Sequence, residues 1–309
     1  MRPDTMLHAI ACAVLFAAAC LAPDAPAAEP AGKADPGAET RVPVPERMAK
    51  QIPPPRTKAE LADVLKGADE KAPTRPIHVV LVAGKKDHGP GEHDYPAWQK
   101  AWATLLAKAP KTKVTTARGK PSAEDFKSAD VMVLFKHMAW PKALNEQVEK
   151  YFDRGGGMVL LHYAVDAGAN PKSVGKHIGL IWGGGCRYRH GWVELSFPDK
   201  LDCPILRGFA GRKVRFHDES YWRLHGDASR VQVLATGQEK EKQGTVTIPL
   251  LWNRRSGKGR VHVNILGHYN WTFNDPLFRV LLLRAIAWAA KEPVDRFNGL
   301  VPVGVTWKD

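Results

Sequence analysis

Ionisable side chains gather in the stretch RFHDESYWRL, which spans residues 215–224 of the 309-residue chain. His217 and Glu219 lie there next to the aromatic pair Tyr221 and Trp222. Neutral imidazole and carboxylate groups bind divalent ions such as zinc or manganese, and they also transfer protons near neutral pH. We therefore predict a functional site in which the aromatic pair forms a wall for sugar stacking. The alternative is a solvated strand end at which Glu219 caps a turn.

Further histidines follow short apolar or glycine-rich segments. His162 follows GGGMVLL, His190 follows WGGGCRYR, His268 follows VNILG, and His88 and His93 share the loop KKDHGPGEHDY. None of them has a diagnostic ligand spacing such as H-E-x-x-H, and a histidine at a strand end commonly makes only a structural hydrogen bond. Both roles remain open for His162 and His268. The candidates for catalysis, or alternatively for holding a divalent metal, are His162, His217, Glu219 and His268.

Several enzyme classes lack their motif in this chain. The segment GGGMVLLHYAVD has the glycine turn, buried strand and sharp turn that carry a Ser or Cys nucleophile in hydrolases and amidotransferases, but His162 occupies that position. The loop GKKDHGPG matches neither phosphate-binding glycine pattern. Cys186 and Cys203 lack the context of a nucleophile, and they either pair or remain free thiols. An enzyme of this sequence is therefore not an amidotransferase.

The elements that must position these side chains are predicted from hydrophobic patterns. Apolar runs begin at Ile77, at Val131 and at Gly157, and helical patterns separate them. This alternation predicts an α/β domain with a mostly parallel central sheet and helices on both sides. Strand-like segments between residues 187 and 264 and a closing helix capped by Asp275 complete the same domain. Ligands bind at the carboxyl ends of such strands, where the histidine-bearing loops lie.

The two ends of the chain differ from this domain in composition. The first residues have an early arginine, an apolar run and small residues before Ala28, which predicts a cleaved secretory signal and a periplasmic or secreted protein. A lipoprotein signal with Cys20 as the lipidated residue is the alternative. The expected organisation is a signal peptide at 1–28, a Pro/Ala-rich linker with one short helix at 29–75, the domain at 76–291 and a tail at 292–309.

The net charge of +13 does not predict a nucleic-acid partner. The 45 lysine and arginine residues are dispersed, without a basic run or a nucleic-acid-binding module. Outside the cytoplasm, such a surface serves solubility or attraction to anionic polymers and acidic saccharides. We expect a small carbohydrate ligand, no nucleic acid and no membrane span in the mature chain.

Several motifs in fixed order resemble the ThuA-like (trehalose utilisation) family over about residues 77–290. They are VLVAG, YFDRGGGMVLLHYAVD, GGGCRYRH, HDESYWRL and the late segment PLLWNRRSGKGRVHVNILGHYNWTFNDPLFRVLLLRAIAWAA. The resemblance implies a flavodoxin-like three-layer sandwich, similar to class I glutamine amidotransferases but without their cysteine. It also implies a setting in bacterial sugar catabolism. Tyr163 departs from the family, which usually has small residues after the strand-end histidine, so the shape of the pocket differs. The pocket positions carried over by motif are His93, His162, His190, Glu219 and His268.

Two functions of different class follow. The first is an enzyme, a hydrolase, lyase or isomerase, that acts on a glycoside or 3-keto sugar with His162 or Glu219 as base. The second is a non-catalytic carbohydrate-binding protein whose aromatic residues stack on sugar rings, with Trp182 and Tyr188 among them. If His162, His217, Glu219 and His268 lay within metal-ligand or hydrogen-bond distance of one another, the enzyme hypothesis would be favoured over the binding protein. The expected substrate-binding residues are His93, His190, Tyr163, Tyr221, Trp222 and Trp271.

Overall fold

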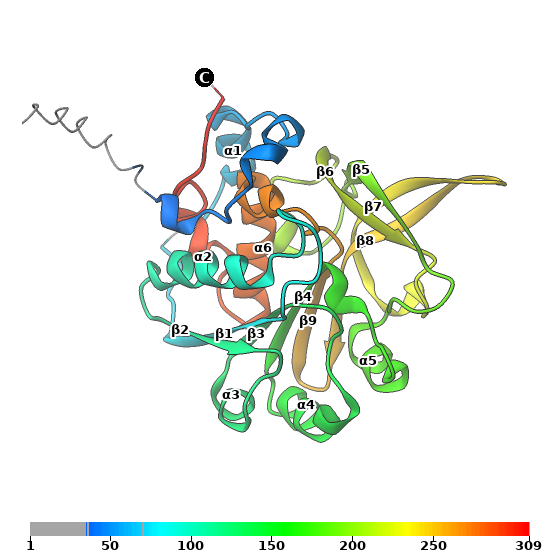
Figure 1. The fold of residues 1–309 in the computed structure, drawn as a ribbon. Coiled ribbons are helices and arrows are strands. Elements are labelled where there is room, and N and C mark those ends of the chain that lie inside the picture. The colour runs from blue at the N-terminus through cyan, green and yellow to red at the C-terminus, as the bar shows by residue number, and fades with distance from the viewer. Residues whose placement is uncertain (1–34, 36, 70, 309) are drawn as a thin grey trace, which may run out of the picture. The chain divides into compact units, whose positions relative to one another are not determined.

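In a computed structural model, which describes residues 35, 37–69 and 71–308, nine strands form one sheet (Figure 1). Their order is β2-β1-β3-β4-β9-β8-β7-β5-β6. The first five strands are parallel to one another, and every pairing from β9 to β6 is antiparallel. The chain therefore has a mixed α/β fold, and the prediction of a mostly parallel sheet holds at one end only.

The parallel end contains the apolar runs that the sequence predicts as strands. They are β1 (Ile77–Ala83), β3 (Val131–Phe135) and β4 (Gly157–Leu161), flanked by β2 (Thr112–Arg118) and β9 (Gly259–Asn264). Every residue of β1, β3 and β4 is buried, as expected for strands that are covered on both faces. The carboxyl ends of these strands lead into the loops that carry His93 and His162.

The antiparallel end is built from long strands. These are β5 (Arg187–Ser196), β6 (Lys213–Trp222), β7 (Gln232–Glu241) and β8 (Gly244–Ser256). Strand β6 is longer than the segment KVRF predicts, because it continues through the stretch HDESYW. The residues from Asp218 to Trp222 are buried, which excludes the alternative of a solvated strand end at this stretch.

Helices cover both faces of the parallel end (Figure 1). Helices α2 (Tyr95–Ala107) and α6 (Pro276–Ala289) lie on one face, and α3 (Ala123–Ser128) and α4 (Asn145–Asp153) lie on the other. Helix α5 (Pro171–Ile178) contacts β8 and β9. The predicted cap of the closing helix is confirmed, since the Asp275 carboxylate accepts hydrogen bonds from the backbone N–H groups of the first turn.

The segment before β1 differs from the extended linker that its composition predicts. The one short helix that the sequence predicts is present as α1 (Lys58–Leu65), which starts with a capping box, but the segment also buries the side chains of Thr40 and Val42. The backbone N–H of Val42 donates to Asn274 Oδ1 at 2.9 Å, and Arg279 Nη2 donates to the Thr40 carbonyl at 3.1 Å. Partners on the domain therefore fix this segment, although its own sequence is rich in proline.

The segment after α6 is also packed. It forms the 3-10 helix η8 (Val294–Leu300), which buries Val294, Phe297 and Leu300 against the domain. Asp35–Asp309 form one compact unit, whereas the predicted signal peptide lies outside the described residues. Across the described residues, no helix combines the length and apolar character needed to cross a membrane. Cys186 and Cys203 are free thiols.

Candidate functional site

His162 lies at the sharp turn that follows β4, as its sequence position predicts. Its φ of 53° is in the left-handed region, and the 3-10 helix η4 (His162–Val165) begins there. Such a conformation costs a non-glycine residue about 1–3 kcal/mol and is common at functional sites. The ring is fully buried, and Nδ1 donates to the Ile265 carbonyl at 2.7 Å. This hydrogen bond leaves the lone pair on Nε2.

His93 approaches His162 from the loop between β1 and α2. Its φ of 41° is also left-handed, and its backbone N–H donates to the His268 carbonyl at 3.0 Å. Its Nδ1 donates to Asp87 Oδ1 at 2.9 Å, and the Tyr95 hydroxyl lies 2.9 Å from the same nitrogen. The Nε2 atoms of His93 and His162 are 2.8 Å apart. Because both Nδ1 atoms are donors, two Nε2 lone pairs face each other across this gap.

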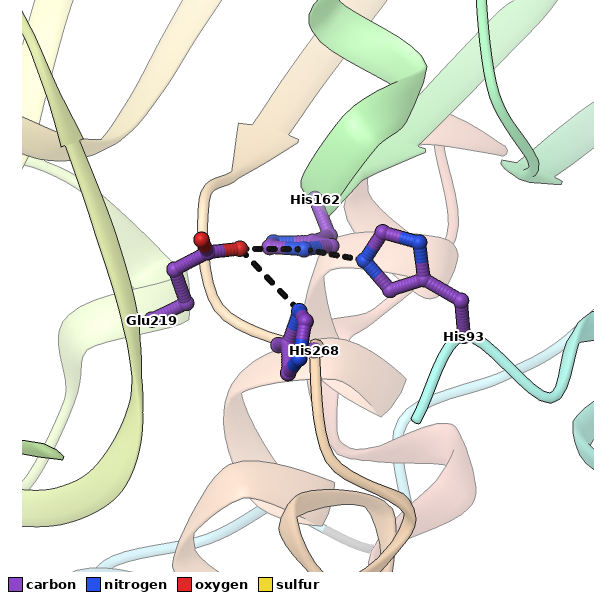
Figure 2. A group of neighbouring side chains, drawn as sticks. All are labelled: His93, His162, Glu219 and His268. Atoms are coloured by element: carbon purple, nitrogen blue, oxygen red, sulfur yellow. Dashed lines mark hydrogen bonds and ion pairs between the residues drawn. The ribbon is translucent and has the colours of Figure 1, made fainter. Parts of the chain in front are cut away.

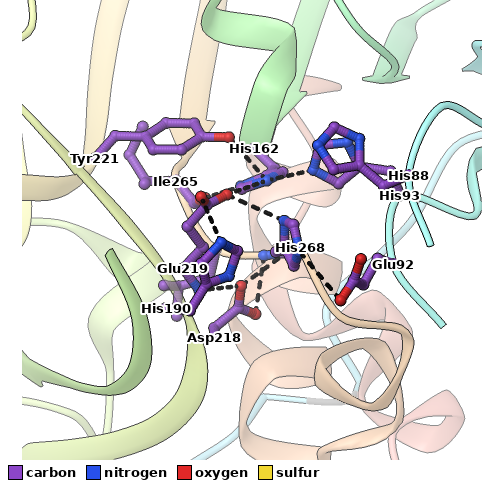
Figure 3. Close-up of polar contacts among 12 residues, drawn as sticks. His88, Glu92, His93, His162, His190, Asp218, Glu219, Tyr221, Ile265 and His268 are labelled. Carbon is purple, nitrogen blue, oxygen red and sulfur yellow. Dashed lines mark hydrogen bonds and ion pairs between the residues drawn. The ribbon is translucent and has the colours of Figure 1, made fainter. Parts of the chain in front are cut away.

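Glu219 and His268 complete the group (Figure 2). One oxygen of Glu219, Oε2, lies 3.2 Å from His162 Nε2 and 3.0 Å from His268 Nδ1. The buried Asp218 carboxylate holds the loop of His268, since it accepts from the backbone N–H groups of Gly267 at 3.0 Å and His268 at 2.9 Å (Figure 3). We call His93, His162, Glu219 and His268 the central cluster.

The donor atoms of the central cluster suit a divalent metal ion. One ligand atom from each residue can be chosen so that all four lie within 4.8 Å of one another. Both ring nitrogens of His268 are buried; Nδ1 has only the Glu219 carboxylate beside it, and Nε2 has no hydrogen-bond partner among the described residues, which is costly in a buried site. Three imidazole nitrogens and one carboxylate oxygen form a common ligand set for zinc and related ions. An ion held by these four donor atoms would take up one of the two buried nitrogens of His268.

The protonation states of the central cluster also favour metal binding. Burial would raise the pKa of Glu219, but the neighbouring rings of His162 and His268 lower it more, so that its pKa lies well below its usual range. Burial lowers the pKa of His93, and the adjacent rings lower it further. Burial also lowers the pKa of His268, although Glu219 acts in the opposite direction. At neutral pH, Glu219 is thus anionic and these two imidazoles are neutral, which are the forms that bind metals.

Three members of the central cluster, His93, Glu219 and His268, line a cavity of about 440 Å³, a size typical of small-molecule sites, whereas the fully buried His162 does not. His190 Nε2 is 3.4 Å from Glu219 Oε1, and its Nδ1 is 3.2 Å from the Tyr269 hydroxyl. The Tyr221 hydroxyl lies 2.9 Å from His162 Nε2. The lining side chains are His88, Glu92, His93, Tyr163, Trp182, Tyr188, His190, Glu219, Tyr221, His268 and Tyr269. They combine polar groups with aromatic faces, a composition that suits a polyhydroxyl ligand.

Most of the predicted site residues meet at this cavity. His162, Glu219 and His268 converge as expected, but the fourth member is His93, which the sequence predicts only as a pocket residue. Asp87 and His88 contact His93 and were missed as site residues, although their loop is rich in ionisable groups. The expected pocket residues that line the cavity are His93, His190, Tyr163 and Tyr221.

Three predicted residues lie outside both this cavity and the central cluster. The ring of His217 faces Trp192 and Trp271 rather than the central cluster, because it is two residues, or about 7 Å, along β6 from Glu219. Trp222 points to the opposite face of β6 from Tyr221, and its indole N–H donates to Glu241 at 2.9 Å. The indole of Trp271 donates to the His217 carbonyl at 2.8 Å.

Comparison with known proteins agrees with this architecture. The profile of the trehalose utilisation family (ThuA) matches residues 79–289. A ThuA-like protein from Parabacteroides merdae superposes with a TM-score of 0.54 at 24% identity, over 70% of this chain and 90% of that chain. A second ThuA-like protein, from Bacteroides uniformis, superposes with a TM-score of 0.55 at 19% identity, over 72% of this chain and 94% of that chain. Among curated proteins, none matches this chain.

Proposed function

The chain belongs to the trehalose utilisation (ThuA) family, and we propose that it acts on a glycoside or a 3-keto sugar by metal-assisted acid and base chemistry. One observation carries this proposal: three imidazole rings and one carboxylate from distant segments converge, and all of them except His162 line a cavity with aromatic sides. A protein that only binds sugars has no need for two strained histidines with facing lone pairs.

In the proposed site, the central cluster holds the metal through His93 Nε2, His162 Nε2, Glu219 and His268. The ion, when bound, polarises a substrate oxygen and stabilises negative charge that develops on it. The Ile265 carbonyl and the Asp87 carboxylate fix the rings of His162 and His93 by accepting from their Nδ1 atoms. These contacts keep both Nε2 atoms directed at the ligand position.

Proton transfer falls to a side chain outside the central cluster. His88 lines the cavity, and its Nδ1 lies 2.8 Å from Asp87 Oδ1, which leaves Nε2 available. In a 3-keto glycoside, the keto group acidifies the adjacent C–H bond. His88 Nε2 takes that proton, the C–H electron pair forms the enolate, and the glycosidic oxygen then leaves with a proton from solvent. The products of this step are an enone and the free alcohol.

The proposal extends to the fold type of the parallel end and to the location of the protein. We infer that the parallel end is a flavodoxin-like three-layer arrangement of the class I glutamine amidotransferase type. The strand order β2-β1-β3-β4-β9 and the helices on both faces support this inference. We also propose that the mature protein is periplasmic or secreted, which its N-terminal composition supports.

The test is turnover by the mature protein with matched panels of disaccharides and their 3-keto derivatives. Each panel is assayed after chelation and after reloading with zinc or with manganese, because four protein ligands close a tetrahedral ion but leave positions open on a six-coordinate one. We expect products from the keto panel only, and only with metal. The His88→Gln variant should retain metal but lose turnover, since glutamine cannot accept the proton. Full turnover after chelation, or no product from either panel, would refute the proposal.

A further inference from the structure

A row of aromatic rings on β5 continues from the cavity onto the open surface. Side chains two residues apart share one face of a strand, so Tyr188, His190 and Trp192 lie on the same face of β5. We call these three residues the aromatic strip. Their register partners on β6 are Tyr221, Glu219 and His217, respectively. The central cluster therefore lies opposite the middle of the strip.

The two ends of the strip are unusually exposed. Tyr188 is 58% exposed and Trp192 is 44% exposed, and among the described residues only two other large hydrophobic side chains are classed as exposed. Exposed aromatic rings beside a polar site are typical of ligand-stacking surfaces. The strand rise separates the two positions by about 13 Å, so that the rings cannot stack on the same small ring.

The strip is continuous with the cavity. Adjacent ring centroids are 5.5–6.2 Å apart along a path through Trp182, Tyr188, His190, Tyr269, His217 and Trp192. The Arg215 guanidinium lies over one face of Trp192, at 4.9 Å from the ring centroid. This contact holds the indole from one side, and the side chain remains 44% exposed.

The charges along the cavity indicate a neutral ligand. Among the described residues that line it, none is a lysine or an arginine. A phosphorylated or carboxylated ligand would find no arginine or lysine in the cavity wall, the side chains that usually recognise such groups. A neutral saccharide offers hydroxyl groups to the histidines and apolar ring faces to the aromatic side chains.

We propose that the aromatic strip binds a neutral oligosaccharide, with one sugar ring near Tyr188 at the central cluster and a distal ring against Trp192. The inference rests on the proposed function and names its substrate class as glycosides longer than one sugar. Trp192 thereby becomes a determinant of chain length. Tyr188, in contrast, contacts the ring that every saccharide substrate places at the cluster.

The test is calorimetric titration of the metal-loaded protein with glucose, maltose and maltotriose, and with cellobiose and cellotriose as the β-linked series. In the unmodified protein, affinity should rise with chain length in at least one series. Trp192→Ala should weaken trisaccharide binding about 3- to 10-fold and leave glucose binding unchanged. Trp192→Phe, the matched control, should retain most of the affinity, and Tyr188→Ala should weaken binding at every length. Bound metal per chain checks that each variant is folded.

Two outcomes overturn the length proposal alone. One is equal affinity for glucose and both trisaccharides, and the other is equal weakening of all lengths by Trp192→Ala. Turnover of 3-keto glycosides, measured separately, reports on the proposed function, and it can persist when chain length has no effect. Failure of every saccharide to bind would also overturn the length proposal, whereas turnover of 3-keto glycosides by the same protein would leave the proposed function standing.

Discussion

Replacing Asp87 by asparagine should weaken metal binding at the central cluster, although Asp87 is not one of its members. The carboxylate accepts from His93 Nδ1 at 2.9 Å and thereby directs His93 Nε2 at His162. An asparagine oxygen can accept the same hydrogen bond but lacks the charge. A hydrogen bond to a charged group contributes about 1.5–3 kcal/mol and a neutral one about 0.5–1.5, so the loss is about 1–1.5 kcal/mol. This difference corresponds to an affinity decrease of about 5- to 13-fold.

Alanine at the same position removes the hydrogen bond entirely, and we expect a loss of about 10- to 100-fold, the usual effect of deleting an outer partner of a metal-binding histidine. The assay is competition for zinc against a chelator of known affinity, at pH 7 and fixed ionic strength. Asp166→Asn is the matched control, because Asp166 contacts His137 at 2.9 Å and does not touch the central cluster. Unchanged zinc affinity in both Asp87 variants, or an equal decrease in the control, would refute the role of Asp87.

Three further predictions concern charge, thiols and acid stability. Glu219→Gln should lower turnover by at least about 100-fold without unfolding the protein, since even outer ligand partners contribute 10- to 100-fold; persistent turnover would remove Glu219 from the site. Cys186→Ser should leave turnover unchanged, because Cys186 is a free thiol bonded to backbone groups, and an inactive variant with normal thermal unfolding would contradict this. The pKa values of His93 and His268 are lowered in the folded state, so the unfolded chain binds more protons as pH falls. The metal-free protein should therefore lose stability below about pH 6.5 in denaturant titrations, and His268→Gln should reduce this pH dependence; a slope unchanged by that variant would refute the assignment.

Local sequence patterns predict much of the fold. The apolar runs of β1, β3 and β4 and the Asp275 cap were evident because burial and capping depend on neighbouring residues. The packing of Thr40 and Val42 was not, because Arg279 and Asn274 fix that segment from more than 200 positions away. The proline-rich composition of the segment does not reveal that such distant residues bind it.

The site likewise has features that local sequence patterns predict and features that only tertiary contacts determine. Side chains alternate between the two faces of β6, so Trp222 and Tyr221 point in opposite directions. The sequence predicts this separation only when the strand is taken to continue through Trp222. The choice of His93 over His217 depends on which loops meet at the sheet edge. The backbone N–H of His93 donates to the His268 carbonyl, a contact between segments that no local pattern predicts. Residue types therefore indicated the chemistry, while tertiary contacts selected the members of the central cluster.

The most direct test of the metal proposal is X-ray absorption spectroscopy at the metal edge of protein loaded with one equivalent of zinc or manganese. Coordination by three imidazole nitrogens and at least one carboxylate oxygen is expected, with one imidazole lost in His162→Gln. That result would establish the central cluster as the metal site. Failure to bind either ion, or an unchanged spectrum in His162→Gln, would contradict it.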